Sequence, residues 1–121
     1  MPKKVLIAED EPNIAVSLEF LLEQSGFETR TVGDGEEALR TAREFRPDLM
    51  LLDVMLPLRN GFEVCQLVRE APELIAMKIV MLTAKGRDTE VAKGLALGAD
   101  AYITKPFATK ELLDTIKRLL E

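Results

Sequence analysis

The 121-residue sequence predicts an α/β fold in which five parallel strands form one doubly wound sheet with helices on both faces. Short apolar runs alternate along the chain with segments of helical periodicity, which is the pattern of consecutive βαβ units. The runs lack the apolar–polar alternation of a half-exposed strand, so both faces of the sheet should be covered. Right-handed crossovers between parallel strands then give a three-layer sandwich. The length suits one domain, residues 1–121.

The first predicted strand is the apolar run Val5–Ala8. The helix after it has Pro12 in its first turn and Gly26 just past its end, the positions that these residue types favour. Its core stripe repeats at helical spacing and consists of Ile14, Leu18, Leu21 and Leu22. Phe27–Val32 is a weaker second strand, because threonine and charged residues interrupt its apolar positions.

The third predicted strand, Leu49–Asp53, has a predicted helix on either side of it in the sequence. Asp34 suits the N-cap of the second helix, and Pro47-Asp48 breaks that helix. Asn60-Gly61 marks a turn, and the third helix follows it and ends before Pro72. The apolar positions of these two helices are Ala38, Ala42 and Phe45, and then Val64, Cys65 and Val68.

Two further βα units complete the predicted sheet. The fourth strand is Lys78–Thr83, and Gly86-Arg87-Asp88 opens a weaker helix that Gly98 closes. Ala101–Thr104 is a short fifth strand, and Thr109 is expected to cap the last helix. The apolar positions of these two helices are Val91, Ala92 and Leu95, and then Leu112, Ile116, Leu119 and Leu120.

The composition is typical of a globular domain, with 47% apolar residues, 31% charged residues and a formal net charge of −5. The absence of a signal-peptide or membrane-spanning pattern predicts a cytoplasmic location. No basic block marks a nucleic-acid surface, so this segment is not expected to bind nucleic acid directly. No apolar stretch approaches the ~20 residues that span a bilayer, and none resembles a signal peptide, so no membrane contact is expected. The single cysteine, Cys65, excludes an internal disulfide. The absence of histidine removes the commonest general base and metal ligand.

Polar side chains stand at the carboxyl ends of four predicted strands: Glu9-Asp10, Asp53, Thr83 and Lys105. The carboxyl ends of parallel strands share one edge of the sheet, where ligands of open α/β sheets bind. In a flavodoxin-like strand order, 2-1-3-4-5, the first and third strands are neighbours. Asp10 and Asp53 would then face the same crevice.

This set of groups suits phosphoryl transfer, which depends on positioning and charge neutralisation. Carboxylate oxygens suit Mg²⁺ or Mn²⁺. A lysine ammonium can reach a phosphoryl oxygen, and a threonine hydroxyl can donate to one. An aspartate can itself attack phosphorus and form an acyl phosphate.

Four segments resemble the receiver domain of two-component response regulators, in a form similar to the chemotaxis regulators. They are Val5–Glu11, Asp48–Pro57, Met81–Ala84 and Gly98–Phe107. They occur in the family's order and at suitable spacing, so the resemblance covers essentially the whole chain.

The resemblance implies a phosphoacceptor and a metal site. Asp53 corresponds to the residue that accepts a phosphoryl group from a phosphohistidine, carried by a sensor histidine kinase or a histidine phosphotransfer protein. Asp10, Asp53 and the backbone carbonyl of Met55 would hold Mg²⁺, with Glu9 acting through a water molecule. The donor histidine must come from another protein, which fits its absence here.

The resemblance also implies a switch. Lys105 would pair with Asp53 and then with the phosphoryl group, aimed by a cis Lys105-Pro106 bond. Thr83 would hydrogen-bond the phosphoryl group, and Tyr102 would change rotamer as Thr83 moves. The surface expected to respond comprises Lys85–Val91 and Ala101–Lys110.

Glu9 departs from the family pattern, which most often has an aspartate at this position. Its extra methylene moves the carboxylate by on the order of 1.5 Å. We expect altered Mg²⁺ affinity or phosphorylation kinetics rather than loss of function.

The predicted function is a phosphorylation-dependent signalling switch that acts on an effector domain or partner protein, with a phosphorylation-dependent dimer left open. The chain would assist its own phosphotransfer and dephosphorylation but would not be a turnover enzyme. One alternative is a pseudo-receiver that binds partners without phosphorylation. Another is a metal-dependent phosphatase, but the haloacid-dehalogenase type needs a second aspartate where this sequence has Met55.

Overall fold

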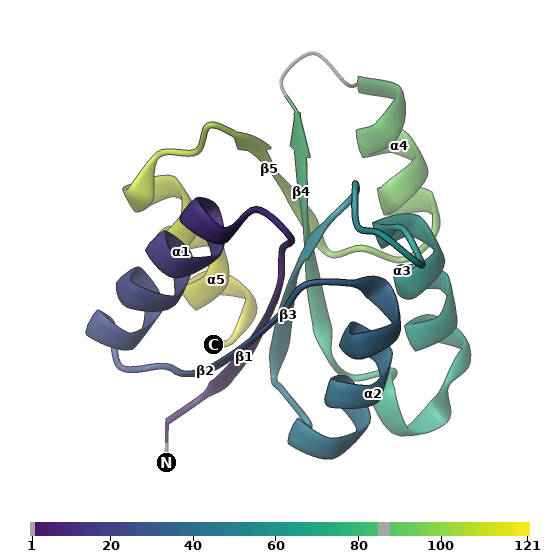
Figure 1. The fold of residues 1–121 in the computed structure, drawn as a ribbon, viewed down its shortest axis with the longest axis horizontal. Coiled ribbons are helices and arrows are strands. Elements are labelled where there is room, and N and C mark those ends of the chain that lie inside the picture. Colours follow the sequence, from purple (N-terminus) through teal and green to yellow (C-terminus); the bar gives the residue numbers. More distant parts are fainter. Residues whose placement is uncertain (1, 85–87) are drawn as a thin grey trace.

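The computed structural model describes residues 2–84 and 88–121, in which five strands alternate with five α-helices (Figure 1). The strands are β1 (Lys4–Ala8), β2 (Glu28–Val32), β3 (Leu49–Asp53), β4 (Lys78–Ala84) and β5 (Ala101–Lys105). The helices are α1 (Pro12–Gln24), α2 (Gly35–Phe45), α3 (Gly61–Glu70), α4 (Asp88–Ala96) and α5 (Thr109–Leu119), and a 3-10 turn, η1 (Pro72–Leu74), precedes β4. Within the described ranges, none of the helices has the length and apolar character needed to cross a membrane.

The strands pair in parallel in the order β2-β1-β3-β4-β5, which confirms the predicted doubly wound sheet and its flavodoxin-like strand order. Helices α1 and α5 cover one face of the sheet, and α2, α3 and α4 cover the other (Figure 1). The direction of winding changes between β1 and β3, so the carboxyl ends of these two strands flank the switch point of the topology.

Strand β3 shows why its apolar run lacks alternation. Leu49 and Leu51 join the core that includes residues of α1 and α5, whereas Met50 and Leu52 join the core that includes residues of α2 and α3. All four side chains are fully buried. Burying a leucine or methionine side chain contributes roughly 1.5–3 kcal/mol. An acidic residue therefore first becomes tolerable at Asp53, where the strand reaches the edge of the sheet.

The strand boundaries differ from the predictions by single residues. Ala84 and Lys105 pair with each other in register, so β4 and β5 each extend one residue further than their apolar runs. At the other edge of the sheet, β1 begins at Lys4 and β2 at Glu28, which also pair. The predicted helix opening at Gly86-Arg87 lies outside the described residues.

Two predicted helix caps have different outcomes. Asp34 caps α2 as predicted, and its carboxylate accepts the backbone N–H of Glu37 at 2.7 Å. The predicted cap at Thr109 is wrong, because Thr109 is the first residue of α5 and Ala108 occupies the N-cap without a side-chain bond. The carbonyl of Ala108 accepts the N–H of Leu112 at 3.1 Å, so the helix begins one residue earlier than predicted.

The start of α3 is held tightly against the end of β3. Asn60, predicted only to mark a turn, forms a capping box: its side chain accepts the N–H of Glu63 at 3.0 Å, and the Glu63 carboxylate accepts the N–H of Asn60 at 3.1 Å. A Cβ added at Gly61 would lie 2.5 Å from the backbone oxygen of Asp53. The chain therefore needs glycine here to bring α3 this close to Asp53.

The start of α1 agrees with the prediction, because Pro12 is the first residue of that helix.

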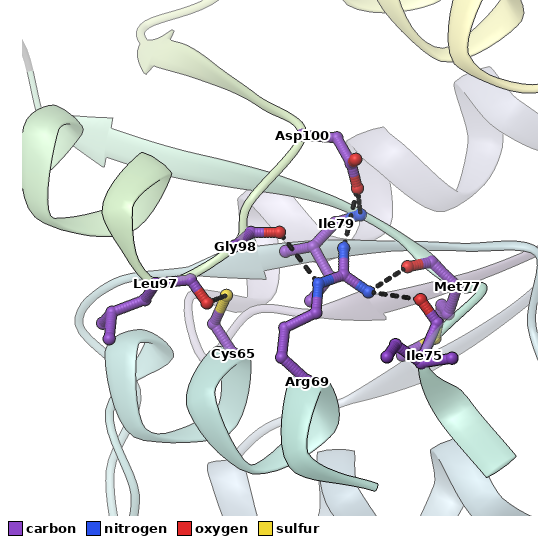
Figure 2. A network of polar contacts seen from close by, with 8 residues as sticks. All are labelled: Cys65, Arg69, Ile75, Met77, Ile79, Leu97, Gly98 and Asp100. Carbon is purple, nitrogen blue, oxygen red and sulfur yellow. Dashed lines mark hydrogen bonds and ion pairs between the residues drawn. The ribbon is translucent and has the colours of Figure 1, made fainter. Parts of the chain in front are cut away.

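Arg69, near the end of α3, ties three backbone segments together at the opposite edge of the sheet (Figure 2). Its guanidinium donates to the carbonyls of Gly98 at 2.8 Å, Ile75 at 3.0 Å and Met77 at 2.7 Å. Gly98 has a φ of +111°, and a Cβ there would lie 2.7 Å from the Arg69 Cγ. The turn after α4 therefore needs glycine for both its conformation and its contact with this arginine.

Asp100 completes the Arg69 network at the start of β5. One carboxylate oxygen accepts from the Arg69 guanidinium at 2.8 Å and from the N–H of Ile79 at 2.8 Å (Figure 2). The network thus joins α3, the segment that enters β4 and the turn that enters β5. It fixes the turn that connects α4 to β5.

We expect Arg69→Met to lower the free energy of unfolding by about 2–4 kcal/mol, because it leaves three carbonyls and a partly buried carboxylate without their donor. Urea unfolding followed by circular dichroism measures the change. Arg40→Met is the matched control, since Arg40 forms an exposed ion pair with Glu37 and should leave the midpoint nearly unchanged. Equal effects of the two substitutions would contradict this role for Arg69.

Candidate functional site

The carboxyl edge of the sheet brings together the predicted polar groups. Glu9 and Asp10 follow β1, Asp53 ends β3, Thr83 lies near the end of β4 and Lys105 ends β5. The Lys105 ammonium lies 2.8 Å from Glu9 Oε1 and 3.0 Å from Asp53 Oδ2. The Lys105-Pro106 bond is cis, as the resemblance implied. One lysine therefore bridges the carboxylates of two strands.

The acidic residues form a cluster that fits a divalent cation. Glu9, Asp10 and Asp53 each place a carboxylate oxygen within 4.8 Å of the others. Glu9 and Asp53 are buried and Asp10 is exposed, so the cluster is open to solvent on one side. Such hard oxygen donors suit Mg²⁺, which keeps several water ligands and needs few from the protein. The three carboxylates therefore fit a divalent cation such as Mg²⁺.

In each buried carboxylate, one oxygen accepts a hydrogen bond from Lys105 and the other accepts one from a backbone N–H. Glu9 Oε2 accepts the N–H of Glu11 at 3.0 Å, and Asp53 Oδ1 accepts the N–H of Met55 at 3.1 Å. These bonds fix the orientation of both side chains without any ligand. Asp53 therefore presents its carboxylate from a preorganised position.

Burial and crowding change the acid–base properties of this group. Burial raises the pKa of Glu9, and the neighbouring Asp53 adds to the rise, while the bond to Lys105 opposes it. Burial alone would lower the pKa of Lys105, but its hydrogen bonds to Glu9 and Asp53 outweigh this and raise it. The lysine therefore stays protonated, and the two buried carboxylates compete for its charge.

Thr83 has a buried hydroxyl that lacks a hydrogen-bond partner among the residues that the structure describes. Thr83, Asp53 and Lys105 line one cavity of about 130 Å³. Val54, Met55, Leu82, Ala84 and Glu90 complete its lining. Buried polar groups are nearly always hydrogen-bonded, so this unpaired hydroxyl is available to a polar group that enters the cavity.

Tyr102 is not part of the acidic cluster but shares a face of the sheet with Thr83. It pairs with Met81, and Thr83 pairs with Thr104 two residues further along. Side chains two residues apart on a strand point to the same face, so the Thr83 hydroxyl and the Tyr102 ring lie on one side. Tyr102 is 47% exposed, so the structure places its ring at the surface and not in the core.

Sequence reasoning missed two contributors to this site. One is the direct ion pair between Glu9 and Lys105, which are 96 positions apart and carry no local signal. The other is the capping box at Asn60 and Glu63 that supports the segment after Asp53. Its spacing, asparagine followed three residues later by glutamate, is a recognised helix-start pattern and could have revealed it.

Residues 5–117 match the family described as the response regulator receiver domain. The chain belongs to this family. The receiver domain is 45% identical over 120 residues to the alkaline phosphatase synthesis transcriptional regulatory protein PhoP of Bacillus subtilis, a match that covers 99% of this chain and 49% of that protein. It is 44% identical to the phosphate regulon transcriptional regulatory protein PhoB of Rhizobium meliloti, covering 99% of this chain and 53% of that protein. The chain thus spans about half the length of these relatives.

Solved structures of receiver domains agree closely with this fold. A putative response regulator from Chloroflexus aurantiacus has a TM-score of 0.96 and 37% identity, over 99% of this chain and 98% of that one. The chemotaxis response regulator CheY4 of Vibrio cholerae has a TM-score of 0.93 and 34% identity, over 99% and 100%. The receiver domain of the Pseudomonas aeruginosa sensor histidine kinase PA1611, with a TM-score of 0.91 and 28% identity over 99% and 98%, has magnesium coordinated in its active-site cleft.

Glu9 predicts a specific pH dependence for the metal-free receiver domain. Because folding raises the pKa of Glu9, the folded state binds that proton more tightly than the unfolded chain does. The resulting stabilisation is fully present below the ordinary glutamate pKa of about 4.5 and is lost as the pH rises through the raised pKa. We therefore expect the stability of the wild type, relative to Glu9→Gln, to fall as the pH increases above about 4.5.

Urea unfolding of both proteins in the presence of a chelator, from about pH 4 to pH 8, measures this difference. Lys105→Met supplies a control, because removal of the shared ammonium should raise the pKa of Glu9 further and extend the decline to higher pH. If the stability of the wild type relative to Glu9→Gln instead increases as the pH rises, the assignment is contradicted.

Proposed function

We propose that this receiver domain is a phosphorylation-dependent switch in which Asp53 accepts a phosphoryl group. The observation that carries the proposal is the buried Asp53 carboxylate, held by Lys105 beside a cavity lined by the unpaired Thr83 hydroxyl. An acceptor, a cation to neutralise the phosphoryl oxygens and a hydroxyl donor thus converge on one small space.

In the proposed reaction an oxygen of Asp53 attacks the phosphorus of a phosphohistidine on another protein. A bond forms between that oxygen and phosphorus, the P–N bond breaks, and the imidazole nitrogen keeps the electron pair. The donor histidine lies on another protein, because this chain contains none. Membership of the receiver family implies that the donor protein is a sensor histidine kinase or a histidine phosphotransfer protein. The chain assists this transfer and the later hydrolysis of the acyl phosphate, in which water takes up the phosphoryl group as inorganic phosphate and Asp53 is restored, but it does not turn over a substrate.

The proposed metal ligands are Asp10, Asp53 and the backbone carbonyl of Met55, with Glu9 acting through water. Mg²⁺, or Mn²⁺ in its place, would supply positive charge for the phosphoryl oxygens. Asp10 is the exposed member of the carboxylate cluster, so a hydrated cation can reach it directly from solvent. The magnesium in the cleft of the PA1611 receiver supports this assignment.

The proposed output runs from Thr83 to the surface. Thr83 would donate its hydroxyl to the phosphoryl group, and Tyr102, on the same face of the sheet, would change rotamer in response. The surface that changes comprises Ala101–Lys110 and Asp88–Val91; residues 85–87 of the predicted surface lie outside the described ranges. Its partner is an effector domain or another protein, and a dimer that forms on phosphorylation is a further outcome.

The relatives suggest where the effector lies. PhoP and PhoB are named as transcriptional regulators, and this chain spans only about half of each. We therefore propose a cytoplasmic regulator in which any contact with DNA is made outside the present 121 residues, which have a net charge of −5 and no basic block.

Phosphorylation of Asp53 is tested by incubating the protein with acetyl phosphate and Mg²⁺ and then measuring its intact mass. We expect a gain of one phosphoryl group that is lost in Asp53→Asn and is strongly reduced in Asp10→Asn, because the acceptor or the cation site has been removed. Asp114→Asn is the matched control, since Asp114 is exposed on α5 and forms an ion pair with Lys110. A folded wild type that binds Mg²⁺ but gains no mass would instead indicate a phosphorylation-independent pseudo-receiver.

The proposed relay is tested by intrinsic fluorescence. Tyr102 is the only tyrosine and the chain has no tryptophan, so the signal reports on one side chain. We expect phosphorylation to change the emission or anisotropy of Tyr102 in the wild type and in Thr83→Ser, which keeps the hydroxyl. Thr83→Ala should still gain a phosphoryl group by mass but lose the fluorescence change. An unaltered response in Thr83→Ala would show that the hydroxyl does not carry the signal.

A further inference from the structure

Glu9 lies in the acidic cluster, yet both of its carboxylate oxygens are already bonded within the protein. Oε1 accepts from the Lys105 ammonium at 2.8 Å, and Oε2 accepts the N–H of Glu11 at 3.0 Å. The Glu9 side chain is 0% exposed, against 5% for Asp53. Of the two carboxylates on Lys105, Glu9 is thus the more deeply buried and the closer.

The topology explains why the contact needs two long side chains. Lys105 ends β5 and Glu9 follows β1, and the sheet places β4 and β3 between them. At about 4.8 Å per strand, the two strands are about 14 Å apart. The Lys105 side chain therefore has to extend along the edge of the sheet as far as Asp53. A glutamate, one methylene longer than the aspartate usual at this position, reaches back toward the ammonium.

We propose that Glu9 is the positioning residue for Lys105. It anchors the ammonium beside Asp53 independently of any metal ion, and it keeps that anchor when the Asp53 oxygen is used to bond phosphorus. Lys105 then remains within reach of the phosphoryl group. This functional consequence rests on the proposed phosphorylation of Asp53, whereas the anchoring itself does not.

The anchoring is tested by the chemical reactivity of Lys105 in the metal-free, unphosphorylated protein. Reductive methylation in the presence of a chelator, followed by peptide mass spectrometry, gives the labelling rate of Lys105 relative to that of the exposed Lys110. We expect Glu9→Gln to raise the relative rate about three- to tenfold, because one charge-assisted hydrogen bond is lost. Asp53→Asn should raise it less, and Glu9→Asp, which keeps the charge, should fall between wild type and Glu9→Gln. Glu11→Gln removes the same charge two residues away and should leave it unchanged.

A second measurement links the anchor to the proposed function. At saturating Mg²⁺, Glu9→Gln should accept phosphate from acetyl phosphate more slowly than wild type, and Glu9→Asp should recover part of the rate. Glu9→Gln should still bind Mg²⁺, as followed by calorimetry, far better than Asp10→Asn does.

The outcomes separate the two proposals. Unchanged Lys105 labelling in a folded Glu9→Gln, or a larger rise in Asp53→Asn, overturns the anchor. Unchanged labelling together with lost Mg²⁺ binding would make Glu9 a metal-site residue instead. If labelling behaves as expected but the wild type gains no phosphoryl group, the proposed function fails and the anchor stands.

Discussion

Two buried carboxylates sharing one ammonium is the interaction on which the arrangement of the site depends. Moving an isolated charge out of water is costly, and two carboxylates at close range also repel each other. Lys105 offsets both the desolvation cost and the mutual repulsion of Glu9 and Asp53. Backbone N–H groups donate to the remaining oxygens of the two carboxylates. The group still carries more negative than positive charge, since Asp10 lies beside it. That imbalance is the electrostatic reason for the edge to attract cations.

The fold supplies this interaction through its topology. A parallel sheet places all carboxyl strand ends on one edge, and the apolar strands below them are rigid because both faces are packed. The two helices beside the site, α3 and α4, are packed to different extents. The capping box and Gly61 hold α3 against Asp53, whereas Gly94 is the buried residue among the described residues of α4. Asp53 therefore lies on a well-supported segment, next to a helix with few buried residues, which is the kind of element that conformational switches use.

Much of this could be predicted from the sequence because the signals are local. The apolar runs and helical stripes gave the five βα units, and the four acidic, hydroxyl and basic strand ends indicated Asp53, Asp10, Thr83 and Lys105. The errors arise where the outcome depends on geometry between segments. Thr109, like Asp34, is a residue type that favours the N-cap, but the path of the chain into α5 gives the cap position to Ala108. Glu9 was expected near the metal, and only the side-chain positions in the structure show that Lys105 reaches it.

The Arg69 network recognises the main chain more than side chains, and this shapes how the sequence can vary. Its guanidinium binds the carbonyls of Ile75, Met77 and Gly98, which any residue would offer if the backbone path were kept. The side chain of Ile75 is exposed to solvent, so other residue types should be tolerated at this position. Arg69, Asp100 and the glycine at 98 are constrained together, because the first two provide the charges and the third provides the space. Within a lineage, substitutions in these three positions should be rare and, where they occur, concerted.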